Sequence, residues 1–130
     1  MIRGIIIGHG SFAEAMLKTV EQIVGKQTEV EVISNKGLSC DSMTETINNA
    51  ILNGDIEKTI VFLDLPGGSC TISCYSLLKG KRKLNIISGV NLPMLIEFFM
   101  LREKYSAEDL VTILIEKGKA NIIQLRCKDG

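Results

Sequence analysis

Short apolar segments alternate with amphipathic ones along the 130 residues of this chain, and this alternation limits the folds open to it. Residues 2–7 and 59–63 are largely apolar, and residues 84–87 form a third segment of this kind. Residues 29–33 alternate polar and apolar side chains, as a strand with one wet face does. Strands that alternate with helices form a parallel sheet with helices on both faces. The sequence therefore predicts a doubly wound α/β fold, with residues 1–130 as one domain.

The burial expected of each strand also orders the sheet. Strands 2–7 and 59–63 are apolar on both faces and are expected at its centre, whereas strand 29–33 is expected at an edge. With right-handed crossovers, the strand order in sequence numbering is 2-1-3-4. The chain then reverses direction between the first and third strands. Ligands of such sheets bind in the crevice outside the carboxyl ends of those two strands.

Four polar residues are expected to start helices. Ser11 and Ser42 each stand three residues before a glutamate, the spacing of a capping box. Asn91 precedes a helix with proline in its first turn, where the missing N–H is harmless. Ser106 is expected to cap the last helix, which should end near Gly118. A further helix is expected to end near residue 78.

His9, the only histidine, directly follows the first strand, and Asp64 follows the third. The two side chains should therefore face each other across the crevice. A neutral imidazole nitrogen can accept a phosphoryl group when a partner fixes the tautomer through the other ring nitrogen and stabilises the developing positive charge. Asp64 suits that role by position. Donors for the phosphoryl oxygens are expected from the glycine-rich turn after Asp64 and from the loop after His9: Gly67, Gly68, Ser69, Gly10 and Ser11.

Alternative interpretations exist for each of these residues. Taken singly, Gly8-His9-Gly10 is an ordinary tight turn and Asp64 an ordinary loop acid, and only their combination favours phosphoryl transfer. Residues 8–13 also match the dinucleotide fingerprint G-x-G-x-x-A, which requires an acid at the end of the second strand. Ser34-Asn35 stands there instead, so nucleotide binding is a minor alternative. Hydrolysis by Ser69 or a cysteine is disfavoured, because neither lies in a G-x-S-x-G turn.

Composition excludes several other classes. Fifteen basic and fifteen acidic side chains cancel, and the only basic cluster lies at residues 79–83, so no nucleic-acid partner is expected. No segment is apolar enough to span a bilayer or to serve as a signal peptide, which favours a cytoplasmic location. The four cysteines have no metal-ligand spacing and are expected to be buried thiols: Cys40, Cys70, Cys74 and Cys127. Neither a metal nor a cofactor is expected.

The segment from residue 92 to residue 101 is apolar on almost every side. A helix of this kind needs cover on more than one side. In so small a domain a second copy of the chain could supply that cover, so the sequence predicts a homodimer. The alternative is a helix sunk in its own core.

Three separated segments together resemble the mannose-type enzyme IIA of the bacterial phosphoenolpyruvate-dependent sugar phosphotransferase system. They are residues 5–11 (I-I-I-G-H-G-S), 64–69 (D-L-P-G-G-S) and 88–95 (S-G-V-N-L-P-M-L). The resemblance implies that His9 receives a phosphoryl group on Nε2 from the histidine phosphocarrier protein (HPr) and passes it to enzyme IIB. Enzyme IIB then phosphorylates a sugar that enters through membrane permease components. It also implies that Asp64 bonds the other ring nitrogen and that Ser69 contacts the phosphoryl oxygens.

The same resemblance implies a dimer in which a C-terminal strand, here residues 120–125, is exchanged between subunits. One departure from the family pattern is Cys70, which stands where proline is usual. Enzyme IIB is expected on a separate protein. Two related functions stay open: the phosphotransferase subunit of a dihydroxyacetone kinase, and a regulatory module whose phosphorylation is sensed. Gly10 and residues 88–94 favour the sugar-transport version over the kinase subunit.

Overall fold

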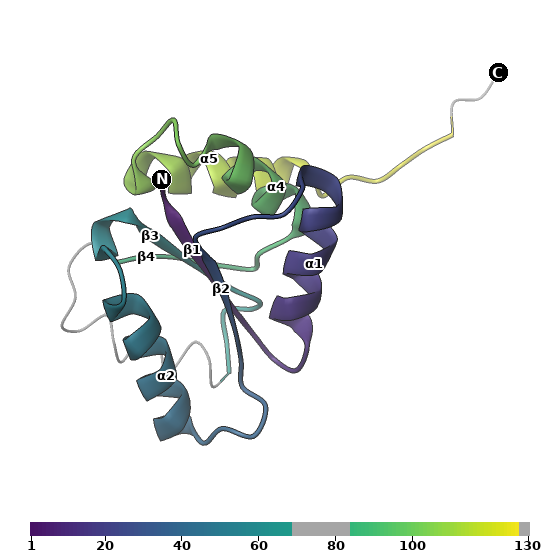
Figure 1. Ribbon diagram of the computed structural model, residues 1–130. Coiled ribbons are helices and arrows are strands. Elements are labelled where there is room, and N and C mark those ends of the chain that lie inside the picture. The colour runs from purple at the N-terminus through teal and green to yellow at the C-terminus, as the bar shows by residue number, and fades with distance from the viewer. Residues whose placement is uncertain (69–83, 128–130) are drawn as a thin grey trace.

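The computed structural model describes residues 1–68 and 84–127. Its four strands form one parallel sheet in the order β2-β1-β3-β4, which confirms the predicted fold class and strand order (Figure 1). The elements are β1 (Arg3–Gly8), α1 (Phe12–Val24), β2 (Val30–Ser34), α2 (Cys40–Leu52), the short 3-10 helix η1 (Ile56–Lys58), β3 (Thr59–Leu63), β4 (Asn85–Ser88), α4 (Leu92–Leu101) and α5 (Ala107–Ala120). The expected helix at residues 70–78 lies outside the described residues.

Alternation of side chains along β1 and β3 builds two cores, one on each face of the sheet. Ile6 and Phe62 point to the face that α1, α4 and α5 cover. Ile5, Ile7 and Val61 point to the opposite face, where α2 packs. Every residue of β1 and β3 is buried, whereas β2 is only partly buried, as its alternating sequence predicted. The two buried strands are the ones whose carboxyl ends hold His9 and Asp64.

The helix starts agree only in part with the sequence. Asn91 and Ser106 cap α4 and α5 as expected, by accepting hydrogen bonds from the backbone N–H groups of Met94 (3.1 Å) and Asp109 (3.2 Å). The two predicted capping boxes are wrong. Ser11 precedes α1 but makes no side-chain capping bond, and α2 begins at Cys40, ahead of Ser42, where Ser39 has the extended backbone that a capping residue requires.

Other boundaries and burials also differ from expectation. The structure has a 3-10 helix, η1, before β3 that was not predicted from the sequence. The backbone of Glu29 is left-handed (φ 53°), and β2 begins one residue later than expected. The last helix runs to Ala120 rather than ending near residue 118. Cys40 and Cys127 are exposed, because one lies in the first turn of α2 and the other in the C-terminal segment. Cys70 and Cys74 lie outside the described residues.

A buried cation closes the end of the sheet opposite to His9. The Arg102 guanidinium, which follows α4, donates to the backbone oxygens of Thr28 (2.7 Å) and Glu29 (3.2 Å) and to the side-chain oxygen of Gln27 (3.1 Å). It also lies 5.0 Å from the centroid of the Phe99 ring. Burial lowers the pKa of Arg102 below the ordinary arginine value. This one side chain therefore joins α4 to the loop that leads into β2.

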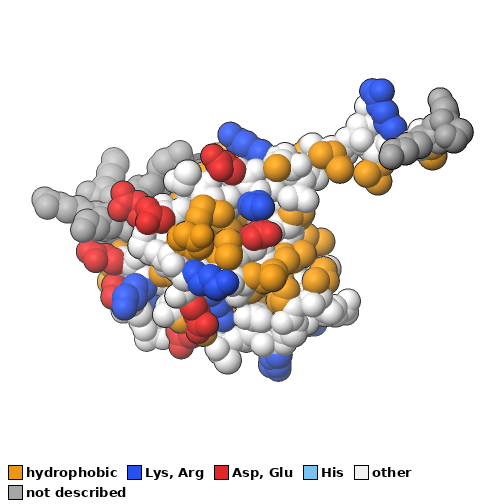
Figure 2. All heavy atoms as spheres, turned by 90° about the horizontal axis from the view of Figure 1, so that it is seen from above, with side chains coloured by type: hydrophobic (Ala, Val, Ile, Leu, Met, Phe, Trp, Pro, Cys, Tyr) orange, Lys and Arg blue, Asp and Glu red, His pale blue; other side chains and the backbone are white. Residues whose placement is uncertain are grey.

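Apolar side chains remain uncovered near the C-terminus. Met100 on α4 is 62% exposed, while Leu95 and Phe98 of the same helix are buried. Residues 122–127 extend away from the body of the molecule and form no strand within the described chain (Figure 1). Their side chains Ile122, Ile123 and Leu125 are exposed. Figure 2, which looks down on the side of α4 and α5, shows exposed hydrophobic side chains among charged ones and the protruding C-terminal segment.

Within the described ranges, no helix has the length and apolar character needed to cross a membrane.

Candidate functional site

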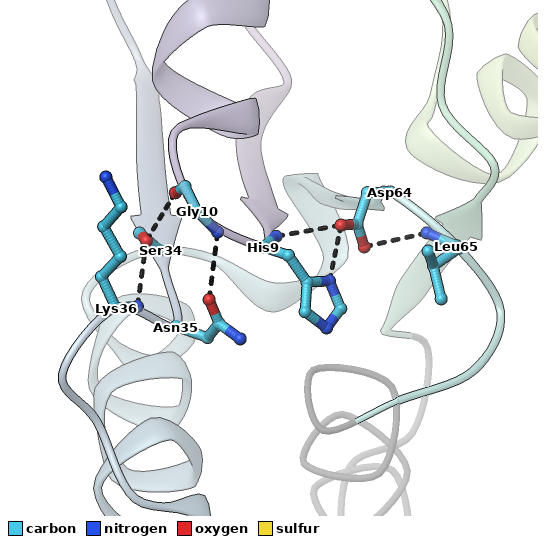
Figure 3. Close-up of polar contacts among 7 residues, drawn as sticks. All are labelled: His9, Gly10, Ser34, Asn35, Lys36, Asp64 and Leu65. Carbon is cyan, nitrogen blue, oxygen red and sulfur yellow. Dashed lines mark hydrogen bonds and ion pairs between the residues drawn. The ribbon is translucent and has the colours of Figure 1, made fainter.

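His9 and Asp64 meet at the carboxyl ends of the two central strands (Figure 3). His9 follows β1, and Asp64 follows β3 directly. The Asp64 Oδ2 atom lies 2.7 Å from the ring Nδ1 of His9 and accepts a second hydrogen bond from the His9 backbone N–H at 2.9 Å. One carboxylate oxygen thus holds both the main chain and the ring of the histidine. The juxtaposition predicted from the strand order is present.

The Asp64 carboxylate is kept ionised by its hydrogen bonds. Its side chain is only 8% exposed, and burial alone would raise its pKa. Hydrogen bonds from the His9 backbone and ring, and from the backbone N–H of Leu65 to Oδ1 at 2.9 Å, outweigh burial. The pKa of Asp64 is therefore lowered from its ordinary value. An ionised carboxylate can only accept hydrogen bonds, so the proton of the neutral imidazole resides on Nδ1.

This tautomer leaves a lone pair on the other ring nitrogen, Nε2. The His9 side chain is 40% exposed, and Gly68 is the glycine that approaches Nε2. A Cβ atom built on Gly68 would lie 3.3 Å from Nε2, and the backbone of Gly68 is left-handed (φ 93°). Both observations favour glycine at this position. The arrangement presents a nucleophilic nitrogen on a partly exposed side chain, next to the backbone of Gly68.

The end of β2 contributes contacts that the sequence did not indicate. The Gly10 N–H, which the sequence suggests as a hydrogen-bond donor to the phosphoryl oxygens, donates instead to the side-chain oxygen of Asn35 at 3.1 Å. The Ser34 hydroxyl donates to the Gly10 carbonyl at 2.6 Å. In the sequence, Asn35 is distinguished only by standing where a dinucleotide-binding protein would have a ribose-binding acid. The predicted strand order could have indicated these contacts: because β2 lies beside β1, residues after β2 lie beside the loop after His9.

The remaining predicted site residues are placed as follows. Gly67 and Gly68 lie in the exposed turn that follows Asp64, and Ser11 is exposed at the start of α1. Ser69 lies outside the described residues. Across residues 1–68 and 84–127, no three histidine, cysteine, aspartate or glutamate side chains are grouped so that they could hold a metal ion.

Fold and site together define a class of protein. A parallel sheet that carries an ionised aspartate and a partly exposed histidine of fixed tautomer at its switch point has the groups that phosphoryl transfer through histidine requires. Residues 4–115 match the family model EIIA-man, described as the PTS system fructose IIA component. The chain belongs to this family.

Individual relatives agree with this assignment. The chain is 34% identical to the mannose-specific EIIAB component of the phosphotransferase system (PTS) of Escherichia coli strain K12, over 98% of its own length. It spans 41% of the length of that relative. It is 31% identical to the PTS fructose-specific EIIA component of Bacillus subtilis strain 168, over 88% of this chain and 80% of that protein.

A solved structure shows the same likeness in three dimensions. The phosphotransferase system component EIIA from Streptococcus agalactiae superimposes with a TM-score of 0.86 at 29% identity, covering 95% of this chain and 97% of that one. The resemblance drawn from the three motifs is therefore confirmed. Membership of this family does not favour the kinase-subunit alternative.

Proposed function

We propose that His9 is the phosphoryl-carrying residue and that Asp64 is its catalytic partner. The observation that supports this assignment most strongly is the 2.7 Å contact between Asp64 Oδ2 and His9 Nδ1, because it fixes the tautomer in which Nε2 is the nucleophile. The donor is HPr and the acceptor is enzyme IIB. The carrier works in the cytoplasm and meets the membrane only through the permease components of the system.

In the transfer step, the Nε2 lone pair attacks the phosphorus atom of the phosphohistidine of HPr. The new bond from Nε2 to phosphorus forms as the bond from phosphorus to the donor nitrogen breaks, and the donor imidazole recovers its electron pair. The Nδ1 proton stays in its hydrogen bond, so the His9 ring becomes positively charged beside an ionised carboxylate. Transfer to enzyme IIB is the same step in reverse, with His9 as the leaving group.

Backbone groups around Nε2 would hold the transferred phosphoryl group. Gly68 lies next to Nε2, and α1 begins at Phe12, directly after the loop that carries His9. A phosphoryl group carries nearly two negative charges and is stabilised by a helix N-terminus. Ser69 and Ser11 are proposed as hydroxyl ligands of the phosphoryl oxygens. Positioning and charge stabilisation supply most of the catalysis.

The direct test is phosphorylation in a reconstituted system. The protein is incubated with phosphoenolpyruvate, enzyme I and HPr, and its intact mass is measured before and after acid treatment. We expect one acid-labile phosphoryl group on the wild type and none on His9→Gln, which keeps a polar side chain at the same place. An unmodified wild type, or an equally modified variant, would contradict the assignment. Subsequent discharge by added enzyme IIB tests the second half of the relay.

We also propose that the chain forms a homodimer. The exposed apolar side chains of Met100 on α4 and of Ile122, Ile123 and Leu125 in the C-terminal segment support this proposal. A groove beside β4, lined in part by Ile86, Ile87, Met94 and Ile115, begins where the C-terminal segment leaves the body. Exchange of residues 120–125 between two copies would cover these side chains and extend the sheet at β4.

Sedimentation tests the homodimer. The full chain should sediment as a dimer, and deletion of residues 122–130 should shift it towards the monomer. A monomeric full chain at micromolar concentration would exclude the proposal.

A further inference from the structure

Asn35 contacts the loop that carries His9, although neither its partial exposure nor its position in the sequence indicates this. It follows β2, the edge strand that pairs with β1, and it is only partly exposed. Figure 3 shows its side chain reaching from the end of β2 to the loop that carries His9, on the side away from Asp64. His9 therefore lies between two polar side chains that follow β2 and β3, the two strands that pair with β1.

The contacts at the end of β2 hold the residues on both sides of His9. The side-chain oxygen of Asn35 accepts a hydrogen bond from the Gly10 N–H at 3.1 Å, and the Asn35 backbone N–H donates to the Gly8 carbonyl at 3.4 Å. Ser34 completes the attachment through its bond to the Gly10 carbonyl. The peptide unit between His9 and Gly10 is thus held from the β2 side, while Asp64 holds the His9 N–H and ring from the β3 side.

The conformation of Gly10 makes this attachment important. Its backbone is left-handed (φ 56°), and a Cβ atom built on it would meet no atom within 4 Å. Besides the bonds to the end of β2, the turn is closed by the Phe12 N–H, which donates to the His9 carbonyl at 3.1 Å. A glycine in open space has more conformations available than any other residue. The hydrogen bond that Gly10 donates to Asn35 and the one that it accepts from Ser34 therefore favour the turn conformation that directs the imidazole.

We propose that Asn35 is a positioning residue for phosphoryl transfer, acting through the Gly10 peptide to keep His9 Nε2 aimed at the incoming phosphorus atom. The proposal rests on the phosphoryl-carrying role of His9 proposed above. The bond to Asp64 fixes one point of the ring, and a ring held at one point can still swing its far nitrogen. In-line transfer requires that nitrogen to be aligned, and small misplacements of a reacting group lower rates strongly.

Two substitutions separate the positioning role from a general effect on folding. Asn35→Ala removes the acceptor for the Gly10 N–H, whereas Asn35→Asp keeps an oxygen acceptor at the same reach. Asn49→Ala, at an exposed asparagine on α2, serves as the matched control. Three measurements are made on each variant: hydrogen exchange of the Gly10 amide, carbon relaxation of the His9 Cε1–H bond as a measure of ring mobility, and kcat and KM for phosphorylation by phospho-HPr.

We expect Asn35→Ala to speed exchange of the Gly10 amide about fivefold, as for loss of one neutral hydrogen bond. Its His9 ring should become more mobile, and its kcat should fall about tenfold with KM unchanged. Asn35→Asp should restore Gly10 protection and ring order, and Asn49→Ala should match the wild type in all measurements. Unchanged ring mobility and kcat in Asn35→Ala, or a ring as mobile in Asn35→Asp as in Asn35→Ala, would overturn the proposal.

These readouts also distinguish failure of the inference from failure of the proposed function. Gly10 exchange and His9 ring mobility are measured on the unphosphorylated protein and need no donor. If the wild type is not phosphorylated by phospho-HPr, the carrier role of His9 is refuted, and the role of Asn35 in transfer is refuted with it. If the wild type is phosphorylated and Asn35→Ala keeps its rate, only the role of Asn35 is refuted.

Discussion

Replacement of Asp64 by asparagine tests the central contact of the site without changing its shape. The carboxylate accepts hydrogen bonds from the His9 N–H and ring on Oδ2 and from the Leu65 N–H on Oδ1. Asparagine has one accepting oxygen and one donating NH2 group. If its oxygen faces His9, the NH2 group confronts the Leu65 N–H. If its NH2 group faces His9, Nδ1 must become an acceptor, and the ring proton moves to Nε2.

With the NH2 group towards His9, the lone pair on Nε2 is lost, and with it the nucleophile. With the oxygen towards His9, the negative charge that stabilises the phosphorylated ring is lost. One hydrogen bond to a charged group contributes about 1.5–3 kcal/mol, which corresponds to about 10- to 100-fold in rate. In hydrolases that use the same histidine–aspartate pair, the wrong tautomer lowers turnover about 10⁴-fold. We therefore expect Asp64→Asn to lower the rate of His9 phosphorylation at least about 100-fold.

The rate is measured by rapid quenching of the reaction with phospho-HPr, followed by intact mass determination. Nitrogen NMR of the His9 ring reports the tautomer on the same samples, and Asp41→Asn, at an exposed aspartate on α2, is the control. A variant that stays folded, keeps the proton on Nδ1 and transfers phosphoryl groups within threefold of the wild-type rate would refute this reasoning.

Three further predictions follow from other contacts. Gly68→Ala should slow phosphorylation of His9, because its methyl group would lie 3.3 Å from Nε2 on a left-handed backbone (φ 93°); an unchanged or faster rate in this variant would contradict the geometry. Because the pKa of Asp64 is lowered in the folded protein, its carboxylate contributes stability above a pH of about 3.9, and this contribution is lost as the pH falls below that value. The free energy of unfolding, measured by urea denaturation, should therefore fall more steeply in acid for the wild type than for Asp64→Asn. Arg102→Lys should lower the free energy of unfolding by about 2 kcal/mol, because an ammonium group cannot make the same set of hydrogen bonds to Thr28, Glu29 and Gln27. The phosphorylation rate should not change. A variant as thermally stable as the wild type would argue against this role of Arg102.

Much of the site followed from the sequence because burial and strand order are set by side-chain pattern. The apolar strands that lead to His9 and Asp64 occupy the sheet centre, where the rule for parallel sheets places a ligand site. No local signal announces a contact between residues 55 positions apart, yet the order of strands was sufficient to predict it.

Contacts that depend on backbone angles were not predictable in this way. Ser42 has the correct spacing for a capping box, but Ser39 has the extended backbone and caps the helix. Glu29 takes a left-handed conformation that its residue type does not favour, and β2 begins after it, at Val30. Asn35 is an ordinary polar residue after an edge strand, and only the position of the neighbouring loop gives it a partner. Local pattern therefore predicts elements better than it predicts their ends.

The open Nε2 of His9 has a kinetic consequence. If His9 carries the phosphoryl group as proposed, the donor and the acceptor react at the same nitrogen and must bind in turn, because both cannot occupy that place together. We expect ping-pong kinetics, with parallel double-reciprocal lines for donor and acceptor. The phosphorylated His9 intermediate then has a lifetime of its own between the two encounters.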